Sequence, residues 1–510
     1  MFHELGEKSQ AHTFPVFILK ASCASKGKMT SMYSSLHDNY VSNKGRRTSC
    51  VTLAVVLGCL TVLGVILAIA VLERPAAPKD HETLPQDTEG DNSTHQCSMS
   101  LVESIPVHLK YKDNVTFGIP LEQVWEDLIS VATKRVEVAS FYWTLTGEDI
   151  NVNTTSDILG KEILKRLEEL PSRNVSVRLV SSIPTVKTNS TDLKILKQKG
   201  VQVRKVNFGR LTNGVLHSKF WIVDRKHVFI GSANMDWRAL TQVKELGVVV
   251  YNCSSLANDL HKIFKSYWVM GLSNSSLPQP WPAEYDTDIN KQHPLLVEED
   301  NTTTSLYISG SPPSFCPRSR TQDLEAILSS ISEAEKFVDV AVMEYFPAIF
   351  YEKPPKYWAV IDDAVRTAAF ERKVKIRMLI SCGRSSNPAM LPFLQSLASM
   401  NNPEHHISIQ IKLYIIPVGN QSDIPFTRIN HNKYMVTDKT AYIGTSNWAG
   451  DYFLTTAGVG LVVSKPTSQS ARSTKTLWSQ LKETFNRDWH SEYAVHLNQC
   501  RPNPDCALLR

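Results

Sequence analysis

The sequence predicts an α/β protein made of two tandem α/β/α sandwich halves, related by pseudo-twofold symmetry and preceded by an N-terminal transmembrane helix. Three observations lead to this prediction. A His-x-Lys motif occurs twice, short β-branched runs recur in the same order around both copies, and a long uncharged apolar run precedes them. With 510 residues, 42% of them hydrophobic, the chain is long enough for two cores of ordinary size besides its tails.

Residues 1–50 are expected to be a cytoplasmic tail, and they are basic. They contain seven Lys and Arg against three Asp and Glu, a net of +4 out of +5 for the whole chain. The basic balance is therefore no argument for a nucleic-acid surface on the folded part, although local clustering could still create one. The segment Tyr33-Ser34-Ser35-Leu36 fits a pattern that sorting adaptors read, unless it is plain disordered tail. Cys50 is a candidate for palmitoylation.

Residues 51–72 carry no charge and are predicted to be a transmembrane signal-anchor. At ~1.5 Å per residue the run spans ~33 Å, enough to cross a bilayer core. Lys44, Arg46 and Arg47 precede it, which favours a cytoplasmic N-terminus and a luminal remainder. The alternative is a cleaved signal peptide with small residues at Ala68-Ile69-Ala70, but the run starts late and is long for one.

Residues 73–98 are rich in Pro, Asp, Glu, Ser and Thr and are predicted to form a luminal stalk. Every glycosylation sequon follows the apolar run, which agrees with a luminal orientation. The nine sequons lie at Asn92, Asn114, Asn153, Asn174, Asn189, Asn252, Asn274, Asn301 and Asn420.

The same side of the apolar run holds six of the nine cysteines, namely Cys97, Cys253, Cys316, Cys382, Cys500 and Cys506. An even number in an oxidising compartment permits disulfides, and six cysteines allow fifteen full pairings. No Cys-x-x-Cys pair is present, so we do not expect a zinc cluster.

The rest of the chain divides into a first half, residues 99–283, and a second half, residues 284–510. Three short strand-like runs of the first half have counterparts in the second: 136–143 and 338–345, 175–180 and 374–379, 201–204 and 409–412. After the motifs, 246–250 corresponds to 459–463. Helices are expected at 157–170 and 359–372, and each half ends in an apolar i, i+4, i+8 stripe: Leu260, Phe264, Trp268 and Leu481, Phe485, Trp489. Strands alternating with helices indicate a sandwich for each half, joined by a linker at 274–294.

The repeated motif runs from His217 to Asp224 and again from His431 to Asp438, and each copy leads into a Gly-Ser/Thr-x-Asn turn. Along a strand, a His and a Lys two residues apart point to the same face. The turn asparagines, Asn234 and Asn447, could then converge on the same place. Since each half supplies one histidine of the pair, we expect a single active site at the junction of the halves.

This set of residues suits double displacement at a phosphodiester. One His attacks phosphorus, giving a phosphohistidine, and the other protonates the leaving oxygen. Lys219, Lys433, Asn234 and Asn447 would bind the phosphoryl oxygens and stabilise their charge. No carboxylate cluster at metal-binding spacing accompanies them, so we expect neither a metal nor another cofactor. Asp224 and Asp438 belong to the motif, but we interpret them as structural, bonding backbone or the Lys amine.

Glu245 follows Asn234 by eleven residues and could orient a histidine through its Nδ1–H group. The matching position in the second half is Gly458, so a second orienting group must come from elsewhere. Glu344 is a weak candidate for it, the alternative being a solvated charge.

The motifs His217-x-Lys219-x4-Asp224 and His431-x-Lys433-x4-Asp438 resemble the signature of the phospholipase D superfamily. The resemblance extends from about Leu101 to Trp489. The membrane anchor, Leu101–Pro106 and Gly231–Gly247 are similar to the transmembrane subfamily, nearest to its third and fourth members. The segments 344–347 and 424–426 favour the fourth.

The resemblance implies a 5′-to-3′ exonuclease on single-stranded DNA and RNA. It would be a type II membrane protein of endoplasmic reticulum, Golgi, endosome and lysosome, active at acid pH, that limits nucleic-acid sensing by Toll-like receptors. It also implies His217 as nucleophile and His431 as proton donor. The family's disulfides correspond to Cys97–Cys253 and to Cys382 with either Cys500 or Cys506.

Two other functions stay open at this stage. The same phosphohistidine could be resolved on a phospholipid, by hydrolysis or by transfer to make bis(monoacylglycero)phosphate. The other is a glycosylated interaction protein whose catalytic site is inactive. The presence of both His-Lys pairs is evidence against it. Whether two chains pair as a homodimer is not evident from the sequence. For a single-strand substrate, one or two aromatic residues near the motifs are expected to stack bases. The candidates are Phe141, Tyr142, Trp143, Trp221, Trp237, Tyr345, Phe346 and Trp448.

Overall fold

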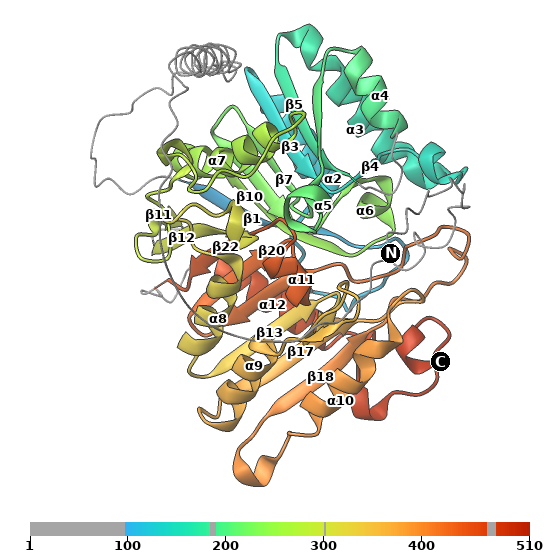
Figure 1. Ribbon diagram of the computed structural model, residues 1–510. Helices are drawn as coiled ribbons and strands as arrows, with labels where there is room; N and C mark the ends of the chain where they lie inside the picture. The colour runs from blue at the N-terminus through green and yellow to red at the C-terminus, as the bar shows by residue number, and fades with distance from the viewer. Residues whose placement is uncertain (1–96, 184–189, 300–301, 467–475) are drawn as a thin grey trace, which may run out of the picture. The chain divides into compact units, whose positions relative to one another are not determined.

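The computed structural model describes residues 97–183, 190–299, 302–466 and 476–510 (Figure 1). These fall within one compact unit that runs from Ser93 to Arg510. The predicted tail, the anchor at 51–72 and nearly all of the stalk lie outside the described residues, so the anchor stays a prediction. In the part that is described, no helix is long and apolar enough to cross a membrane.

The first half is built on an eight-stranded sheet in the order β2-β1-β10-β8-β7-β3-β5-β6. Strands β3, β5 and β6 are parallel, whereas β7, β8, β10 and β1 pair antiparallel. The bounds are β1 Ser98–Ser104, β2 Ile119–Pro120, β3 Arg135–Ser140, β5 Ser176–Ser182, β6 Gln202–Val206, β7 Phe220–Val223, β8 His227–Gly231 and β10 Glu245–Tyr251.

The second half has a nine-stranded sheet in the order β11-β12-β22-β20-β19-β13-β17-β18-β23. From β12 to β18 this order repeats that of β1 to β6 in the first sheet, which confirms the predicted pair of related sandwiches. The bounds are β11 Leu295–Glu299, β12 Thr302–Ser311, β13 Phe337–Val342, β17 Lys375–Ser381, β18 Ile409–Tyr414, β19 Lys433–Thr437, β20 Thr440–Gly444, β22 Gly458–Ser464 and β23 Ala494–His496. Three two-residue pairs accompany the sheets: β4 Trp143–Thr144 with β9 Met235–Asp236, β14 Tyr345–Phe346 with β21 Trp448–Ala449, and β15 Ala348–Ile349 with β16 Lys356–Tyr357.

Helices follow the strands in both halves, including the two expected at 157–170 and 359–372. The first half contains α2 Leu121–Val131, α3 Ile158–Glu169, α4 Thr191–Gln198, α5 Phe208–Thr212, α6 Trp237–Thr241 and α7 Ser254–Met270. The second contains α8 Asp323–Glu333, α9 Val360–Phe370, α10 Leu391–Ala398, α11 Gly450–Leu454 and α12 Leu477–Trp489. Apolar residues at helical spacing face the sheets; in α3 these are Ile163, Leu164 and Leu167.

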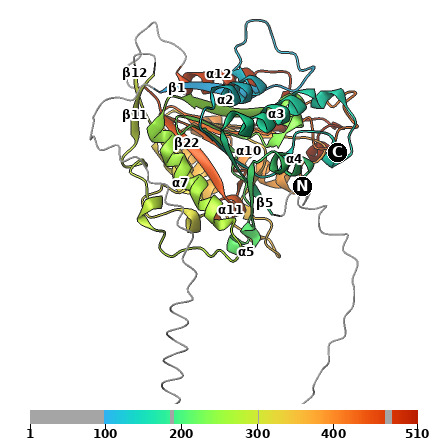
Figure 2. The same cartoon turned by 90° about the horizontal axis from the view of Figure 1, so that it is seen from above.

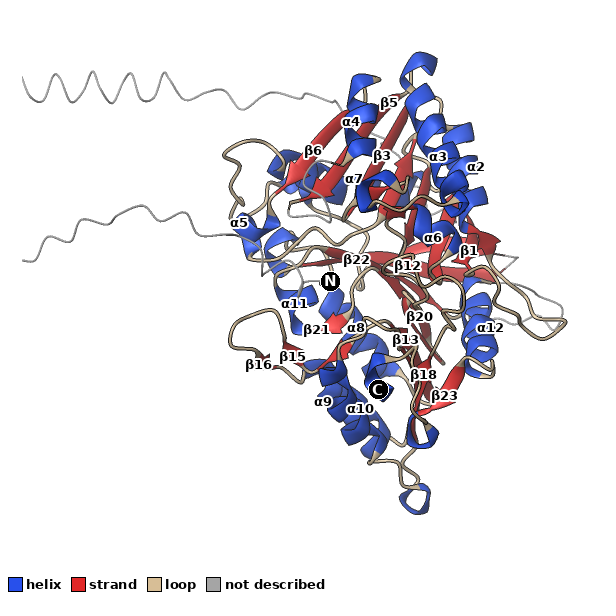
Figure 3. Cartoon of the chain, turned by 90° about the vertical axis from the view of Figure 1, so that its right-hand side faces the viewer, coloured by secondary structure: helices blue, strands red, loops and turns tan. Residues whose placement is uncertain are grey.

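The two sheets have separate outer cores and share an inner one. In the first half, α2 and α3 cover one face of the sheet and α7 the other (Figure 2). In the second half, α8, α9 and α10 cover the outer face. The shared core joins the inner faces of both sheets with the apolar stripes of α7 and α12. Helix α7 also contacts β12, and α12 contacts β1, so each closing helix packs against the opposite half (Figure 3).

The predicted linker is packed against this structure rather than loose. Trp281 and Tyr285 are buried in the shared core, and the Trp281 Nε1–H group donates to the Ser314 carbonyl at 2.8 Å.

One disulfide joins Cys97 to Cys253 and another Cys382 to Cys506, while Cys316 and Cys500 are unpaired. The six sequon asparagines within the described ranges are all exposed: Asn114, Asn153, Asn174, Asn252, Asn274 and Asn420.

Candidate active site

The two His-x-Lys segments meet at the junction of the halves because each is held by the backbone of the opposite half. The His217 amide donates to the Ala457 carbonyl at 2.9 Å, and the His431 amide donates to the Lys244 carbonyl at 2.8 Å. Ala457 and Lys244 occupy equivalent positions, one residue before β22 and β10. A single site therefore receives both histidines, as the sequence predicts.

The two lysines follow their histidines by two residues, where β7 and β19 begin. Lys219 immediately precedes β7, and Lys433 is the first residue of β19. Each Nζ donates to the carbonyl of its own histidine, at 2.6 Å from Lys433 to His431. Both lysines are fully buried, whereas His217 and His431 retain 6% and 8% exposure. The two histidines thus keep a small contact with solvent that the two lysines lack.

The two histidines have different partners at Nδ1. His431 Nδ1 lies 2.9 Å and 3.0 Å from the two carboxylate oxygens of Glu245. His217 Nδ1 lies 2.9 Å from the carbonyl oxygen of Thr445. Both acceptors hold the proton on Nδ1, which leaves Nε2 of each ring for the substrate. The group that orients His217 is thus a backbone carbonyl. Because every residue has one, the sequence could not predict it.

Glu344 lies in the site, but it contacts an asparagine instead of a histidine. Its Oε2 accepts from Asn447 Nδ2 at 2.8 Å, and the same Nδ2 donates to the Tyr452 hydroxyl at 3.0 Å. Glu344 is partly buried, and desolvation raises its pKa. The Oδ1 atoms of Asn234 and Asn447 are buried without a hydrogen-bond partner. Unsatisfied buried polar atoms of this kind are costly and call for a partner.

The site gathers four basic groups away from water, and the pKa of each is lowered. Burial and the neighbouring cations hold the pKa of His217 and of Lys219 well below their usual ranges. Burial lowers the pKa of Lys433 to about 7. The pKa of His431 is lowered by burial and the lysines even though Glu245 acts in the opposite direction. An anion at the centre of this cluster would relieve the repulsion, so the site is built for one.

Asp224 and Asp438 lie apart from this chemistry and bind backbone, and neither bonds the motif lysine. The Asp224 carboxylate accepts from the amides of Thr133, Lys134 and Arg135 at 2.7–2.8 Å. Asp438 Oδ1 accepts from the amides of residues 335, 336 and 337. Each carboxylate thus fixes the turn that leads into β3 or β13.

Most of the predicted stacking aromatics are core residues. All eight are buried, and Trp221, Trp237, Tyr345 and Trp448 are at most 1% exposed. Of the eight, Phe141 is in ring contact with a catalytic candidate, with its centroid 5.4 Å from that of His217. Sequence reasoning missed Tyr452, whose ring lies edge-on to His217 at 5.1 Å.

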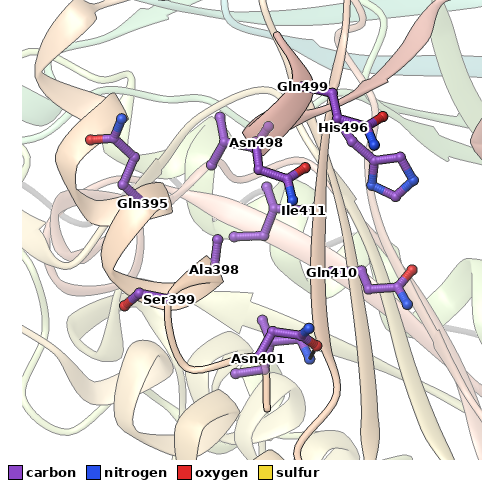
Figure 4. A pocket seen from close by; sticks show the side chains of 11 residues that line it. Gln395, Ala398, Ser399, Asn401, Gln410, Ile411, His496, Asn498 and Gln499 are labelled. Carbon is purple, nitrogen blue, oxygen red and sulfur yellow. Dashed lines mark hydrogen bonds between the residues drawn. The ribbon is translucent and has the colours of Figure 1, made fainter. Parts of the chain in front are cut away.

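Among the described residues, no group of three or more His, Cys, Asp or Glu side chains is placed to hold a metal ion. A cavity of about 620 Å³ lies elsewhere, between α10, β18 and the segment after β23 (Figure 4). Amide side chains such as Gln395, Gln410 and Asn498 line it, and none of the residues predicted for catalysis does.

Comparison with known proteins identifies a matching family model, two similar relatives and a solved structure with the same fold. Residues 112–419 match the family model described as "PLD3/4, PLD-like domain". The chain is 49% identical to human "5'-3' exonuclease PLD4" over 83% of each chain. It is 47% identical to "5'-3' exonuclease PLD3" of Xenopus laevis, over 79% of this chain and 82% of the relative. Among solved structures, a phosphatidylserine synthase of Haemophilus influenzae Rd KW20 matches with a TM-score of 0.50 at 13% identity, over 74% of this chain and 85% of that one, which shows a shared fold alone.

Proposed function

This chain belongs to the PLD3/4 family of phospholipase D-like proteins, and from that premise we propose that it is a 5′-to-3′ exonuclease on single-stranded DNA and RNA. The observation that carries the proposal is the convergence of His217 and His431, with their lysines, at one buried site of excess positive charge. A phosphodiester is an anion that would balance this positive charge, and it contains a bond that two histidines can break.

In the first step, Nε2 of His217 attacks phosphorus with its lone pair, and the bond from phosphorus to the leaving oxygen breaks. His431 gives its Nε2 proton to that oxygen, so the departing strand leaves as an alcohol. In the second step, water attacks the phosphohistidine, His431 takes up the water's proton, and His217 is released. Lys219 and Lys433 are placed to stabilise the charge on the oxygens that do not leave, and Asn234 can add to this through its Nδ2 group. The Nδ2 group of Asn447 instead binds Glu344 and Tyr452.

Electrostatics divides these roles between the two histidines. The Glu245 carboxylate stabilises an imidazolium at His431, which suits a proton donor. The neutral Thr445 carbonyl stabilises an imidazolium at His217 far less, and burial with the neighbouring cations lowers the pKa of His217, which favours a neutral, nucleophilic ring. The different Nδ1 partners therefore favour the reactive combination of a neutral His217 with a protonated His431.

The predicted topology belongs to this proposal. A type II anchor at 51–72 would place the site in the lumen of endosomes and lysosomes, reached through endoplasmic reticulum and Golgi. Exposure of six sequon asparagines supports glycosylation there. Degrading single strands in that lumen would limit their sensing by Toll-like receptors. No observation in the described structure favours phospholipid as the substrate, since the fold match to a lipid enzyme carries no activity.

The test uses the purified protein at pH 5 with EDTA and a single-stranded oligonucleotide labelled at its 3′ end. Stepwise shortening from a free 5′-hydroxyl end, lost in His217→Ala, is expected. A double-stranded oligonucleotide tests whether the strand must be unpaired. A 5′-phosphorylated oligonucleotide tests whether the 5′-hydroxyl must be free. No cleavage by protein that melts cooperatively would contradict the nuclease assignment, and phosphatidylglycerol vesicles would then be assayed with the same variant.

A further inference from the structure

The hairpin of β15 and β16 and the loop between them, residues 348–357, form an exposed arm that the mechanism above does not use. Every residue from Tyr351 to Tyr357 is exposed, with Tyr351 at 39% and Tyr357 at 78%. Exposed aromatic rings gathered on one segment can mark a ligand-binding surface. The arm and helix α11 lie on the same side of the second half (Figure 3).

The arm is attached to α11, the helix that follows the second turn asparagine. The Asp451 carboxylate accepts from the amides of Phe350 at 2.6 Å and Tyr351 at 3.1 Å. Gly450 lies so close to Ile349 and Trp358 that an added Cβ would come within about 3.0 Å of both. The base of the arm therefore has a defined position on α11 and does not swing freely.

Tyr351 connects the arm to the nucleophile through one intervening residue. Its hydroxyl donates to the Tyr452 hydroxyl, and the two rings lie 6.4 Å apart edge-on. Tyr452 in turn lies 5.1 Å from His217 and accepts from Asn447. The exposed face of Tyr351 is thus one side chain away from the ring that attacks phosphorus.

The arm also carries the charges that a nucleic-acid strand requires. Lys353 and Lys356 are exposed within it, and Lys356 pairs with Glu352 at the surface. Aromatic rings interspersed with cations are the usual platform for single strands, because every base has a π-face and every linkage a charge. Phe117 and Phe370 are also exposed, but each has a cation of this chain over its ring, Arg487 over Phe117 and Lys373 over Phe370.

We propose that Tyr351 stacks on a nucleobase flanking the scissile phosphate, and that the arm beyond it, with Lys353 and Tyr357, guides the adjoining strand. The proposal rests on the nuclease function and makes it more specific. It moves the stacking platform from the buried aromatics expected from the sequence to a segment that is exposed. Binding there would be tolerant of base identity but would require a base.

The test combines a protein change with a substrate change. Tyr351→Ala and Tyr351→Phe are compared with the unaltered protein on an intact oligonucleotide and on oligonucleotides abasic at the first or the second nucleotide. For Tyr351→Ala we expect kcat/KM on the intact strand to fall about tenfold, mainly through KM. With the unaltered protein, kcat/KM on one of the two abasic oligonucleotides should be about tenfold lower than on the intact strand. With Tyr351→Ala, removing that same base should lower kcat/KM little further. Tyr351→Phe should keep the stacking and most of the activity.

Two outcomes would overturn the proposal. Independent effects of Tyr351→Ala and both abasic sites would show that the ring does not stack on either base. Equal losses for Tyr351→Phe and Tyr351→Ala would show that the hydroxyl acts through Tyr452 instead. Turnover of methyl p-nitrophenyl phosphate, which has no base, should change little in Tyr351→Ala. If the unaltered protein hydrolyses this diester but no oligonucleotide, the nuclease function fails, which is a different result from loss of coupling.

Discussion

At the scale of single residues, the two halves differ most at the atom that faces each histidine's Nδ1. The first half supplies the Glu245 carboxylate, whereas the second has Gly458 at the equivalent position and supplies the Thr445 carbonyl. A charged acceptor stabilises the imidazolium, and a neutral one does so far less. A duplicated motif thereby gives one histidine that attacks and one that donates a proton.

We predict that Glu245→Gln moves the alkaline limb of the kcat/KM profile to lower pH. The carboxylate raises the pKa of His431 against burial and the lysines, so its neutralisation lowers that pKa further. The protonated, reactive fraction of His431 then shrinks at every pH above the new value. At pH 5 we expect kcat/KM to fall roughly 10- to 100-fold, with a smaller loss at more acid pH. Initial rates on an oligonucleotide between pH 4 and 7 measure this.

The matched control is Glu162→Gln on the exposed face of α3, which should leave the profile in place. A Glu245→Gln variant whose activity falls equally at all pH values would show that Glu245 positions the ring without tuning its charge.

At the scale of elements, Asp224 and Asp438 show why a member of a repeated motif need not act on the substrate. Each carboxylate sits at the end of its motif strand and binds a row of amides at the start of β3 or β13. These turns set where the central strand of each sheet begins, and the motif strands pair directly with those central strands.

Asp224→Ala should therefore destabilise the fold by roughly 1–3 kcal/mol, toward the lower end because the carboxylate is partly solvated. Burial raises the pKa of Asp224, but the hydrogen bonds outweigh it and the net pKa is lowered. Its contribution is thus fully present above the unfolded value of ~3.9 and is lost as pH falls through the folded value. Urea unfolding should give the same difference from the unaltered protein at pH 5 and 7, and a smaller one below about pH 4.

The kcat of Asp224→Ala, measured well below its melting temperature, should stay within about twofold of the unaltered protein. A loss of several orders of magnitude in a folded protein would instead place Asp224 in the chemistry.

The sequence was sufficient for the elements whose signal is local. The β-branched runs at 136–143 and 374–379 and the apolar stripe of α7 required no knowledge of their partners. Strand β12 was not foreseen, because Thr302–Ser311 is polar at its start and becomes a strand by pairing with β22. In the site, the motif predicted the histidines and lysines. It did not predict Thr445, which acts through its backbone carbonyl, or Tyr452, which contacts His217 from another element.

At the scale of the whole molecule, the two halves are one folding unit because their inner core is shared. Strands β1, β8 and β10 contribute to it with α7, and β12, β20 and β22 contribute with α12. A buried ion pair crosses this core on each side. Arg320 of the second half pairs with Asp259 of α7 at 2.5 Å. On the other side, Lys244 Nζ lies 2.9 Å from Asp488 of α12 and 3.4 Å from Glu103 of β1.

Lys244 is the connection between this core and the catalytic acid. Its side chain is fully buried between carboxylates from both halves, while its carbonyl receives the His431 amide and its neighbour is Glu245. Arg487 completes the cluster and, against the effect of burial, helps to lower the pKa of Glu103 to about 2. A carboxyl with so low a folded value stays ionised at pH 5, so the cluster keeps its charges under acid conditions.

We therefore predict that Lys244→Met lowers the stability of the whole molecule by about 3–5 kcal/mol, because it leaves buried carboxylates short of a cation. Calorimetry should show one transition moved to lower temperature, since neither half has a complete core alone. Arg320→Met removes the corresponding pair on the other side, away from His431, and should cost a similar amount. Below both melting temperatures, Lys244→Met should lose more kcat than Arg320→Met, because only the former shifts the backbone that holds the proton donor. Two separate transitions in either variant would mean that the halves fold independently.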